Sequence, residues 1–191
     1  MTRTLALSVS LLLAGFLTFG PPGHTQGYTT GSGANRTSQP AVDDVLRGFT
    51  SGAQQLCGNV PDPAYRVDCL ADYFDWLADR LPQSQDFREA QSILRDAARQ
   101  MNRVARENAS STRRPAVIRQ NSSASSKRTS RAVIPVAPER QAAARAAAVA
   151  IVKETQTRLL RAAERSERRK VAFTNIAAAI GNSSLILLRS G

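Results

Sequence analysis

The only two cysteines of the chain, Cys57 and Cys69, enclose a strong signal for the start of a helix. Asp62 precedes Pro63, which places a carboxylate at the N-cap and a proline at the first helical position. Apolar residues recur every three or four positions both before Cys57 and after Pro63, as in helices with one buried face. A disulfide between the two cysteines would tie the end of one helix to the second turn of the next. Chain entropy predicts about 3 kcal/mol of stabilisation for closing a loop of this length.

Whether the cysteines pair depends on the compartment, and the N-terminus indicates export. Arg3 is followed by an apolar or small-residue run, Leu5–Phe19, which a Gly-Pro-Pro sequence ends. This is the layout of a secretory signal peptide, and the run is shorter than the roughly 20 apolar residues of a membrane span. We expect a signal peptide over residues 1–25, cleaved between Gly23 and Gly27. The mature protein is then periplasmic or secreted, and an oxidising compartment favours a disulfide over a metal or redox site. The alternative is a membrane protein that retains this segment as an anchor.

The first part of the mature chain is predicted to be a stapled helical bundle. Residues 26–39 are rich in Gly, Ser and Thr without apolar periodicity, so a flexible leader is expected. Residues 40–108 then carry three apolar stripes at helical spacing, separated by turn signals. Ser84 is expected to cap the third helix. The three helices are predicted over residues 40–57, 63–81 and 84–108.

The second part of the chain changes character twice. Residues 109–138 are Ser-rich, basic and free of aromatic side chains, which predicts a disordered linker. Residues 139–181 are strongly helical in composition and predict one long helix, ended by Gly181-Asn182 and followed by a short apolar tail over residues 182–191. The alternative is a bend or break in the charged stretch Glu164–Lys170. The expected fold class is all-α: a small disulfide-stapled bundle of three helices, a flexible basic linker and a long Ala/Arg-rich C-terminal helix.

Charge is divided sharply between the two parts. Residues 26–82 carry four basic and seven acidic side chains, a net charge of −3, whereas residues 83–191 carry 21 basic and eight acidic ones, a net charge of +13. A basic half suggests an anionic partner: an envelope polymer, a lipid surface, or a protein. No nucleic-acid motif is present and no aromatic residue lies among the arginines, so specific nucleic-acid recognition is disfavoured. The candidate contact residues all lie in the linker: Arg113, Arg114, Arg119, Lys127, Arg128 and Arg131.

Four aspartates share one face of the second predicted helix: Asp68, Asp72, Asp75 and Asp79. The favoured interpretation is a solvated face, or one that docks on arginines of the third or the C-terminal helix. No calcium-loop pattern accompanies them. A carboxylate-dependent hydrolase that uses this helix is the alternative.

The inventory of reactive residues otherwise argues against catalysis. The single histidine, His24, lies beside the expected cleavage point, which leaves the mature chain without an imidazole for a His-dependent triad or a zinc site. Paired cysteines supply no nucleophile, and neither a G-x-S-x-G nor a Walker glycine loop occurs. We therefore expect no catalytic residue, metal or cofactor. The sequence predicts an exported, non-enzymatic helical protein with a binding or scaffolding role.

Overall fold

The computed structural model describes residues 38–122 and 125–188. The predicted signal peptide and almost all of the predicted leader lie outside these residues. Within them, five α-helices make up most of the chain, so the all-α prediction is confirmed. The helices are α2 (Ser38–Ala53), α3 (Arg66–Arg80), α4 (Arg88–Glu107), α5 (Gln141–Glu164) and α6 (Glu167–Leu188).

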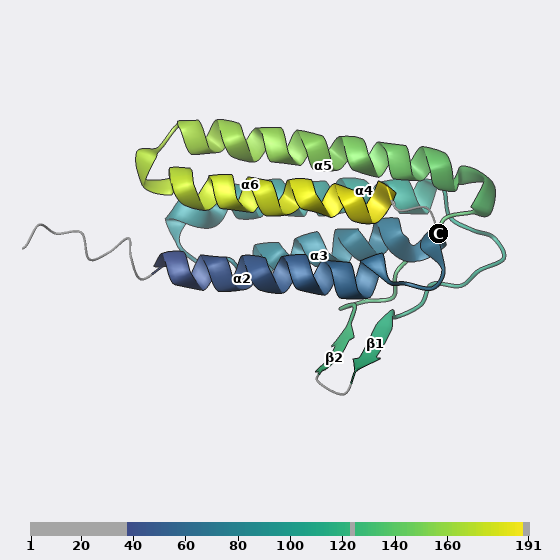
Figure 1. The fold of residues 1–191 in the computed structure, drawn as a ribbon. Coiled ribbons are helices and arrows are strands. Elements are labelled where there is room, and N and C mark those ends of the chain that lie inside the picture. Colours follow the sequence, from purple (N-terminus) through teal and green to yellow (C-terminus); the bar gives the residue numbers. More distant parts are fainter. Residues whose placement is uncertain (1–37, 123–124, 189–191) are drawn as a thin grey trace, which may run out of the picture. The chain divides into compact units, whose positions relative to one another are not determined.

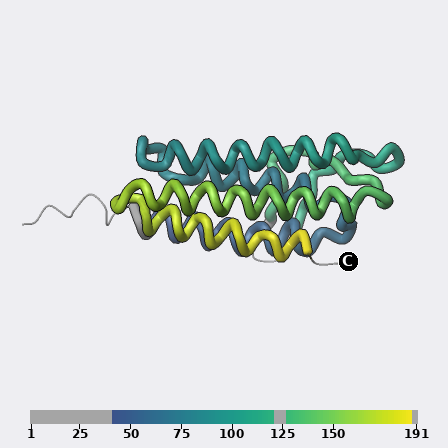
Figure 2. The backbone as a smooth tube through the Cα atoms, turned by 90° about the horizontal axis from the view of Figure 1, so that it is seen from above, coloured from purple at the N-terminus to yellow at the C-terminus, as the bar shows by residue number. Residues whose placement is uncertain are grey.

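The five helices run side by side and form a closed ring of neighbours (Figure 1). Each helix packs against the next one along the chain, and α6 closes the ring against α2. Figure 2 shows α5 lying between α4 and α6. A single short antiparallel hairpin interrupts the helices between α4 and α5, formed by β1 (Arg119–Ser122) and β2 (Ser125–Arg128). It projects from the side of the bundle that α2 and α3 form.

The helix-start signal between the cysteines is confirmed. The Asp62 carboxylate accepts a hydrogen bond from the Ala64 backbone N–H at 3.0 Å, and Pro63 opens a 3₁₀ turn that leads into α3. A second 3₁₀ turn, Gln85–Phe87, leads into α4. Ser84 is the N-cap residue of this turn, as predicted, and has an extended backbone, but its side chain makes no capping hydrogen bond in the described structure.

The predicted disulfide between Cys57 and Cys69 is also confirmed. The two Cα atoms lie 5.6 Å apart, and both side chains are fully buried. Cys57 belongs to a π-helical turn, Gln54–Gly58, that continues α2, and Cys69 lies in the first turn of α3. Between the same two helices, the Phe49 ring meets the Phe74 ring edge-on, with centroids 5.8 Å apart. The staple therefore joins two helices that already share an aromatic core.

The long C-terminal helix is two helices. The helical run ends at Glu164, turns at Arg165 and Ser166, and returns antiparallel as α6. The break falls in the charged stretch that the sequence offered as the alternative. It lets α6 bury a stripe that includes Phe173, Ile176 and Ile180, which a continuous helix would hold away from the bundle.

Gly181-Asn182 does not end a helix, because α6 continues to Leu188. A Cβ atom at Gly181 would lie 2.6 Å from the Gln156 side chain of α5, so the glycine permits close packing of two helices. The predicted apolar tail is largely the last turns of α6, in which Ile186 and Leu187 are buried.

The prediction of a disordered linker over residues 109–138 is wrong for its described residues. Ala116 and Val133 pair as an antiparallel bridge, and the Val136 N–H donates to the Ala64 carbonyl at 2.9 Å. Val133 and Val136 are fully buried. The short apolar side chains of this polar segment are thus buried against the bundle. Its backbone groups form hydrogen bonds with each other and with Ala64, just before α3.

Candidate functional site

The acidic face of α3 is the anchor of the 109–138 segment. Asp68 is fully buried and receives both arms of the Arg131 guanidinium, at 2.6 and 2.8 Å. The same carboxylate accepts hydrogen bonds from the Ile134 N–H at 2.8 Å and from the Asn102 side chain at 2.7 Å. A bidentate arginine and two further donors are what a buried carboxylate requires. The hydrogen bond to Asp68 also raises the pKa of Arg131.

Asp72, one turn further along α3, holds the adjacent residue of the same segment. Its carboxylate accepts hydrogen bonds from the Ser130 backbone N–H at 2.8 Å and from the Ser130 hydroxyl. The Nε of Arg131 lies 3.9 Å away. Asp68 and Asp72 together therefore fix residues 130–134 against α3. The predicted docking of this acidic face on arginines of the third helix is confirmed at Asp79, which pairs with Arg95 of α4, whereas the arginine at Asp68 comes from the linker.

The two remaining aspartates of this face, Asp75 and Asp79, have different surroundings. Asp79 is exposed and pairs with Arg95 of α4 at 2.9 Å. Burial raises the pKa of Asp75, Arg131 opposes the increase, and the charges of Asp79 and Asp72 add to it. Among the described residues, no three His, Cys, Asp or Glu side chains gather in a metal-binding arrangement.

The structure separates the six predicted anion-contact residues into two groups. Arg131 is committed to Asp68, and Arg113 pairs with Asp62 at 3.2 Å. Arg114 is exposed close to Tyr65, whose hydroxyl donates to its backbone carbonyl. The other three residues lie on the hairpin: Arg119 on β1, and Lys127 and Arg128 on β2.

The hairpin concentrates like charge. Arg119 is the direct cross-strand partner of Arg128, and both are exposed. Neither arginine has an ion-pair partner in residues 38–122 and 125–188. Lys127 reaches back to the bundle and donates to the Gln55 side chain at 2.9 Å. Like charges directly opposite each other destabilise a strand pair, so the hairpin carries positive charge that its own fold does not compensate.

A pocket of about 580 Å³ lies between this hairpin and the bundle. Tyr73 and Trp76 of α3 supply its aromatic lining, with ring centroids 5.9 Å apart. A Cβ atom at Gly52 would lie 2.9 Å from the Tyr73 ring, so the glycine lets the ring rest on the backbone of α2. The remaining lining residues come from α2, α3 and the second strand with the turn that follows it: Gly48, Asp72, Lys127, Arg128, Thr129 and Ser130.

The sequence patterns do not predict this pocket, because Lys127 and Arg128 were expected to belong to a disordered linker. Two signals were available: Trp76 is the only tryptophan of the chain, and Gly48 and Gly52 are small residues one helical turn apart. Neither signal indicates that residues 127–130, more than 50 positions further along the chain, complete the pocket.

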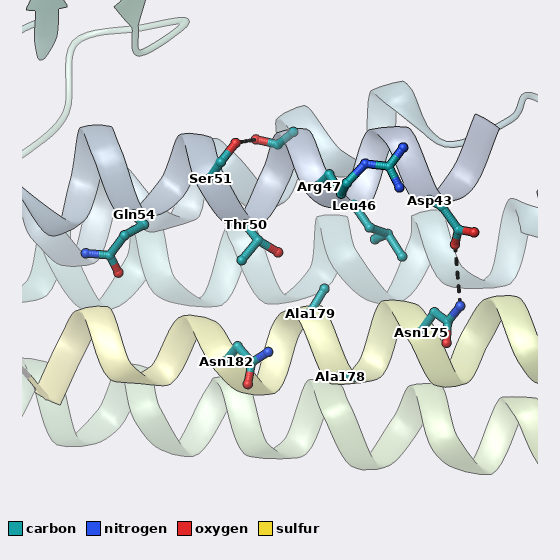
Figure 3. Close-up of a pocket in the computed structure, with 11 residues that line it drawn as sticks. Asp43, Leu46, Arg47, Thr50, Ser51, Gln54, Asn175, Ala178, Ala179 and Asn182 are labelled. Carbon is teal, nitrogen blue, oxygen red and sulfur yellow. Dashed lines mark hydrogen bonds between the residues drawn. The ribbon is translucent and has the colours of Figure 1, made fainter. Parts of the chain in front are cut away.

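A second depression follows the seam between α2 and α6 (Figure 3). It is an open groove of about 830 Å³ whose floor includes Leu46 and Ala179. Asn175 of α6 donates to the Asp43 carboxylate across it at 3.4 Å. The groove lacks the concentration of charge and aromatic surface that marks the hairpin pocket.

No family model, no curated protein and no solved structure matches this chain. One helix of the described residues, α6, is long and apolar enough to cross a membrane, but half of its most apolar window is buried inside the bundle.

Proposed function

We propose that this chain is an exported, non-enzymatic helical protein whose hairpin contacts an anionic polymer of the cell envelope or the extracellular space. The observation that supports this most is the cross-strand pair of Arg119 and Arg128, two exposed cations for which the described residues provide no acid. A polyanion that lies across the hairpin would place acidic groups between them. The cost of holding like charges together would then be offset on binding.

The rigid mounting of the hairpin also supports a binding role. Residues 130–134 are fixed to α3 through Asp68 and Asp72, and Lys127 is fixed to Gln55. Cations whose backbone is held in place lose less conformational entropy on binding than cations on a mobile tail. A disordered basic tail would offer attraction alone, whereas a mounted hairpin offers a defined spacing of charges.

A polymer is favoured over a lipid surface by the composition of the hairpin. The sequence between the two cationic positions, residues 120–127, contains no large apolar or aromatic residue. Binding to a bilayer interface usually combines cations with apolar side chains that enter the acyl boundary.

The hydrolase alternative is left with weaker candidates. Asp68 and Asp72 accept hydrogen bonds from the segment that they anchor, so neither carboxylate is free to take a proton from a substrate. Asp75 has the raised pKa that a general acid needs, but it is not paired with a second unoccupied carboxylate in the described structure.

The test uses the chain produced with its own N-terminus in an exporting host. The exported protein is applied at low salt to dextran sulfate resin and to plain dextran resin, and its intact mass is measured. We expect retention on the sulfated resin alone, with elution as NaCl rises towards physiological strength, where the Debye length is about 8 Å. Absence of retention at low salt, or equal retention on both resins, would contradict the proposal. Retention on phosphatidylglycerol vesicles without retention on dextran sulfate would contradict the choice of a polymer.

A further inference from the structure

The pocket beside the hairpin combines two chemistries that a plain polyanion would not use together. One side is an aromatic wall and the other carries cations. We infer that this pocket binds one acidic sugar unit of the polymer, with the sugar ring against Trp76 and the acidic group towards Lys127 and Arg128. The inference rests on the proposed function and names the chemical class of its ligand.

The aromatic wall is fixed and partly open to solvent. Tyr73 is almost fully buried between α2 and α3, whereas Trp76 next to it is half-buried and lines the pocket. Arg80 stacks over the Trp76 ring at 5.3 Å and helps to hold it. The C–H face of a sugar ring carries a slight positive charge and suits the negative face of an indole. An aromatic ring kept partly exposed beside a pocket therefore suits a carbohydrate.

The cationic side also contains one acid. Asp72 lines the pocket, and its oxygens accept the two Ser130 hydrogen bonds. Lys127 and Arg128 outnumber it, so the charged lining residues together remain positive and attract an anion. Lys127 is held by its hydrogen bond to Gln55, and Arg128, the next residue of β2, also lines the pocket and has no ion pair among residues 38–122 and 125–188. A carboxylate or sulfate placed here gains charge-assisted hydrogen bonds from one or both cations.

The size of the pocket agrees with this ligand class. Its volume of about 580 Å³ falls within the range of small-molecule sites and leaves room for one or two sugar rings. A sugar-free polyanion such as polyphosphate would satisfy the cations but leave the Trp76 surface unused. Ligands with and without a sugar ring can therefore be told apart at this one residue.

Trp76 is the only tryptophan, so its fluorescence reports on the pocket directly. The exported chain is titrated with short oligogalacturonates, with sulfated dextran fragments and with polyphosphate, and affinities are measured by calorimetry. We expect both acidic sugars to change the Trp76 emission on binding and polyphosphate to bind without that change. The carboxylate and sulfate ligands then show which acidic group is preferred.

Two variants test the pocket itself. Trp76→Leu removes the stacking surface and is expected to weaken oligogalacturonate binding by about tenfold. Gly48→Ala adds a methyl group 3.4 Å from the Trp76 ring, which is an ordinary contact distance. The methyl group reduces the space in the pocket, and alanine has a higher helix propensity than glycine. It is expected to weaken oligogalacturonate binding and to leave polyphosphate binding unchanged. Ser51→Ala, on the same helix but outside this pocket, is the control.

The outcomes separate the two proposals. If acidic sugars bind without a change in emission, or bind Gly48→Ala and Trp76→Leu as tightly as the natural chain, the sugar site is wrong and the polyanion contact stands. If no polyanion binds at all, the proposed function itself fails.

Discussion

The hairpin segment and the α5–α6 turn are both rich in arginine, yet they use it in opposite ways. At the turn, Arg165 and Arg169 meet Glu89, and Arg168 meets Asp86, so the cations join the start of α6 to the start of α4. On the hairpin, exposed arginines face each other and the described residues supply no acid. Composition cannot distinguish these cases, because the difference lies in where the fold places the acidic side chains.

Arg131 shows that a third use exists within the hairpin segment itself. Its side chain is about one-third exposed, but its partner Asp68 is fully buried and accepts from four donors in total. Residues 109–138 therefore contain one cation that anchors the segment to α3 and others that remain free to contact an anion.

Asp68→Ala breaks the anchor and is expected to have the largest effect. It leaves Arg131, the Ile134 N–H and the Asn102 side chain without their acceptor. We expect the free energy of unfolding to fall by about 3–4 kcal/mol, towards the lower end for a buried pair because Arg131 keeps contact with water. Urea denaturation measures the change. Asp79→Ala, which breaks an exposed pair with Arg95, is the control and should cost less than about 1 kcal/mol. Equal losses from the two variants would show that Asp68 is not an anchor.

Removing the disulfide tests the bundle beneath the hairpin. The Cys57→Ala/Cys69→Ala variant is expected to lose about 3 kcal/mol of stability through the freed loop. The hairpin remains attached to α3 through Asp68, so dextran sulfate binding well below the melting temperature should not change. A loss of binding in a variant that is still folded by circular dichroism would mean that the staple positions the hairpin.

Arg165→Ala/Arg168→Ala removes two of the turn pairs and is expected to cost about 1 kcal/mol in total, because both arginines are more than half exposed. High salt should reduce this difference, since the pairs are screened. A loss as large as that of Asp68→Ala would indicate that the turn depends on these pairs as strongly as the hairpin depends on its anchor.

Arg128→Glu converts the like-charge strand pair into an opposite-charge pair with Arg119. We expect a gain of about 0.2–1 kcal/mol in stability, the usual size of a cross-strand pair. Binding to dextran sulfate should weaken at the same time. A variant that is both more stable and a weaker binder would show that Arg128 contributes to anion binding at the expense of stability. Unchanged binding would show that Arg128 does not contact the anion.

The first half of the fold was predictable because its signals are local. Asp62 and Pro63 mark a helix start within two residues, and the apolar stripes around Cys57 and Cys69 define two helices whose facing sides can be joined. The acidic face of α3 was equally visible from helical geometry. What it binds was not visible, because Arg131 lies 63 positions away from Asp68.

The errors in the second half have a common physical origin. Residues 109–138 look disordered when taken alone, since few of them are apolar, and they become ordered only because α3 offers buried carboxylates and a free carbonyl at Ala64. Gly181 has the sequence signature of a helix end, but the structure uses it to make room for the Gln156 side chain of α5. The hairpin pocket likewise requires α2, α3 and β2 to meet. Each feature depends on a partner distant in sequence, which single-sequence patterns do not identify.

One binding experiment compares the hairpin arginines with the arginines of the α5–α6 turn. Arg119→Ala/Arg128→Ala and Arg165→Ala/Arg168→Ala each lower the formal net charge by two, since each removes two cations. Affinity for dextran sulfate is measured for both variants and for the natural chain at the same ionic strength. If the hairpin is the contact surface, the hairpin variant loses about tenfold in affinity and the turn variant changes little. Equal losses, or a larger loss for the turn variant, would show that overall charge rather than the hairpin governs binding and would contradict the account.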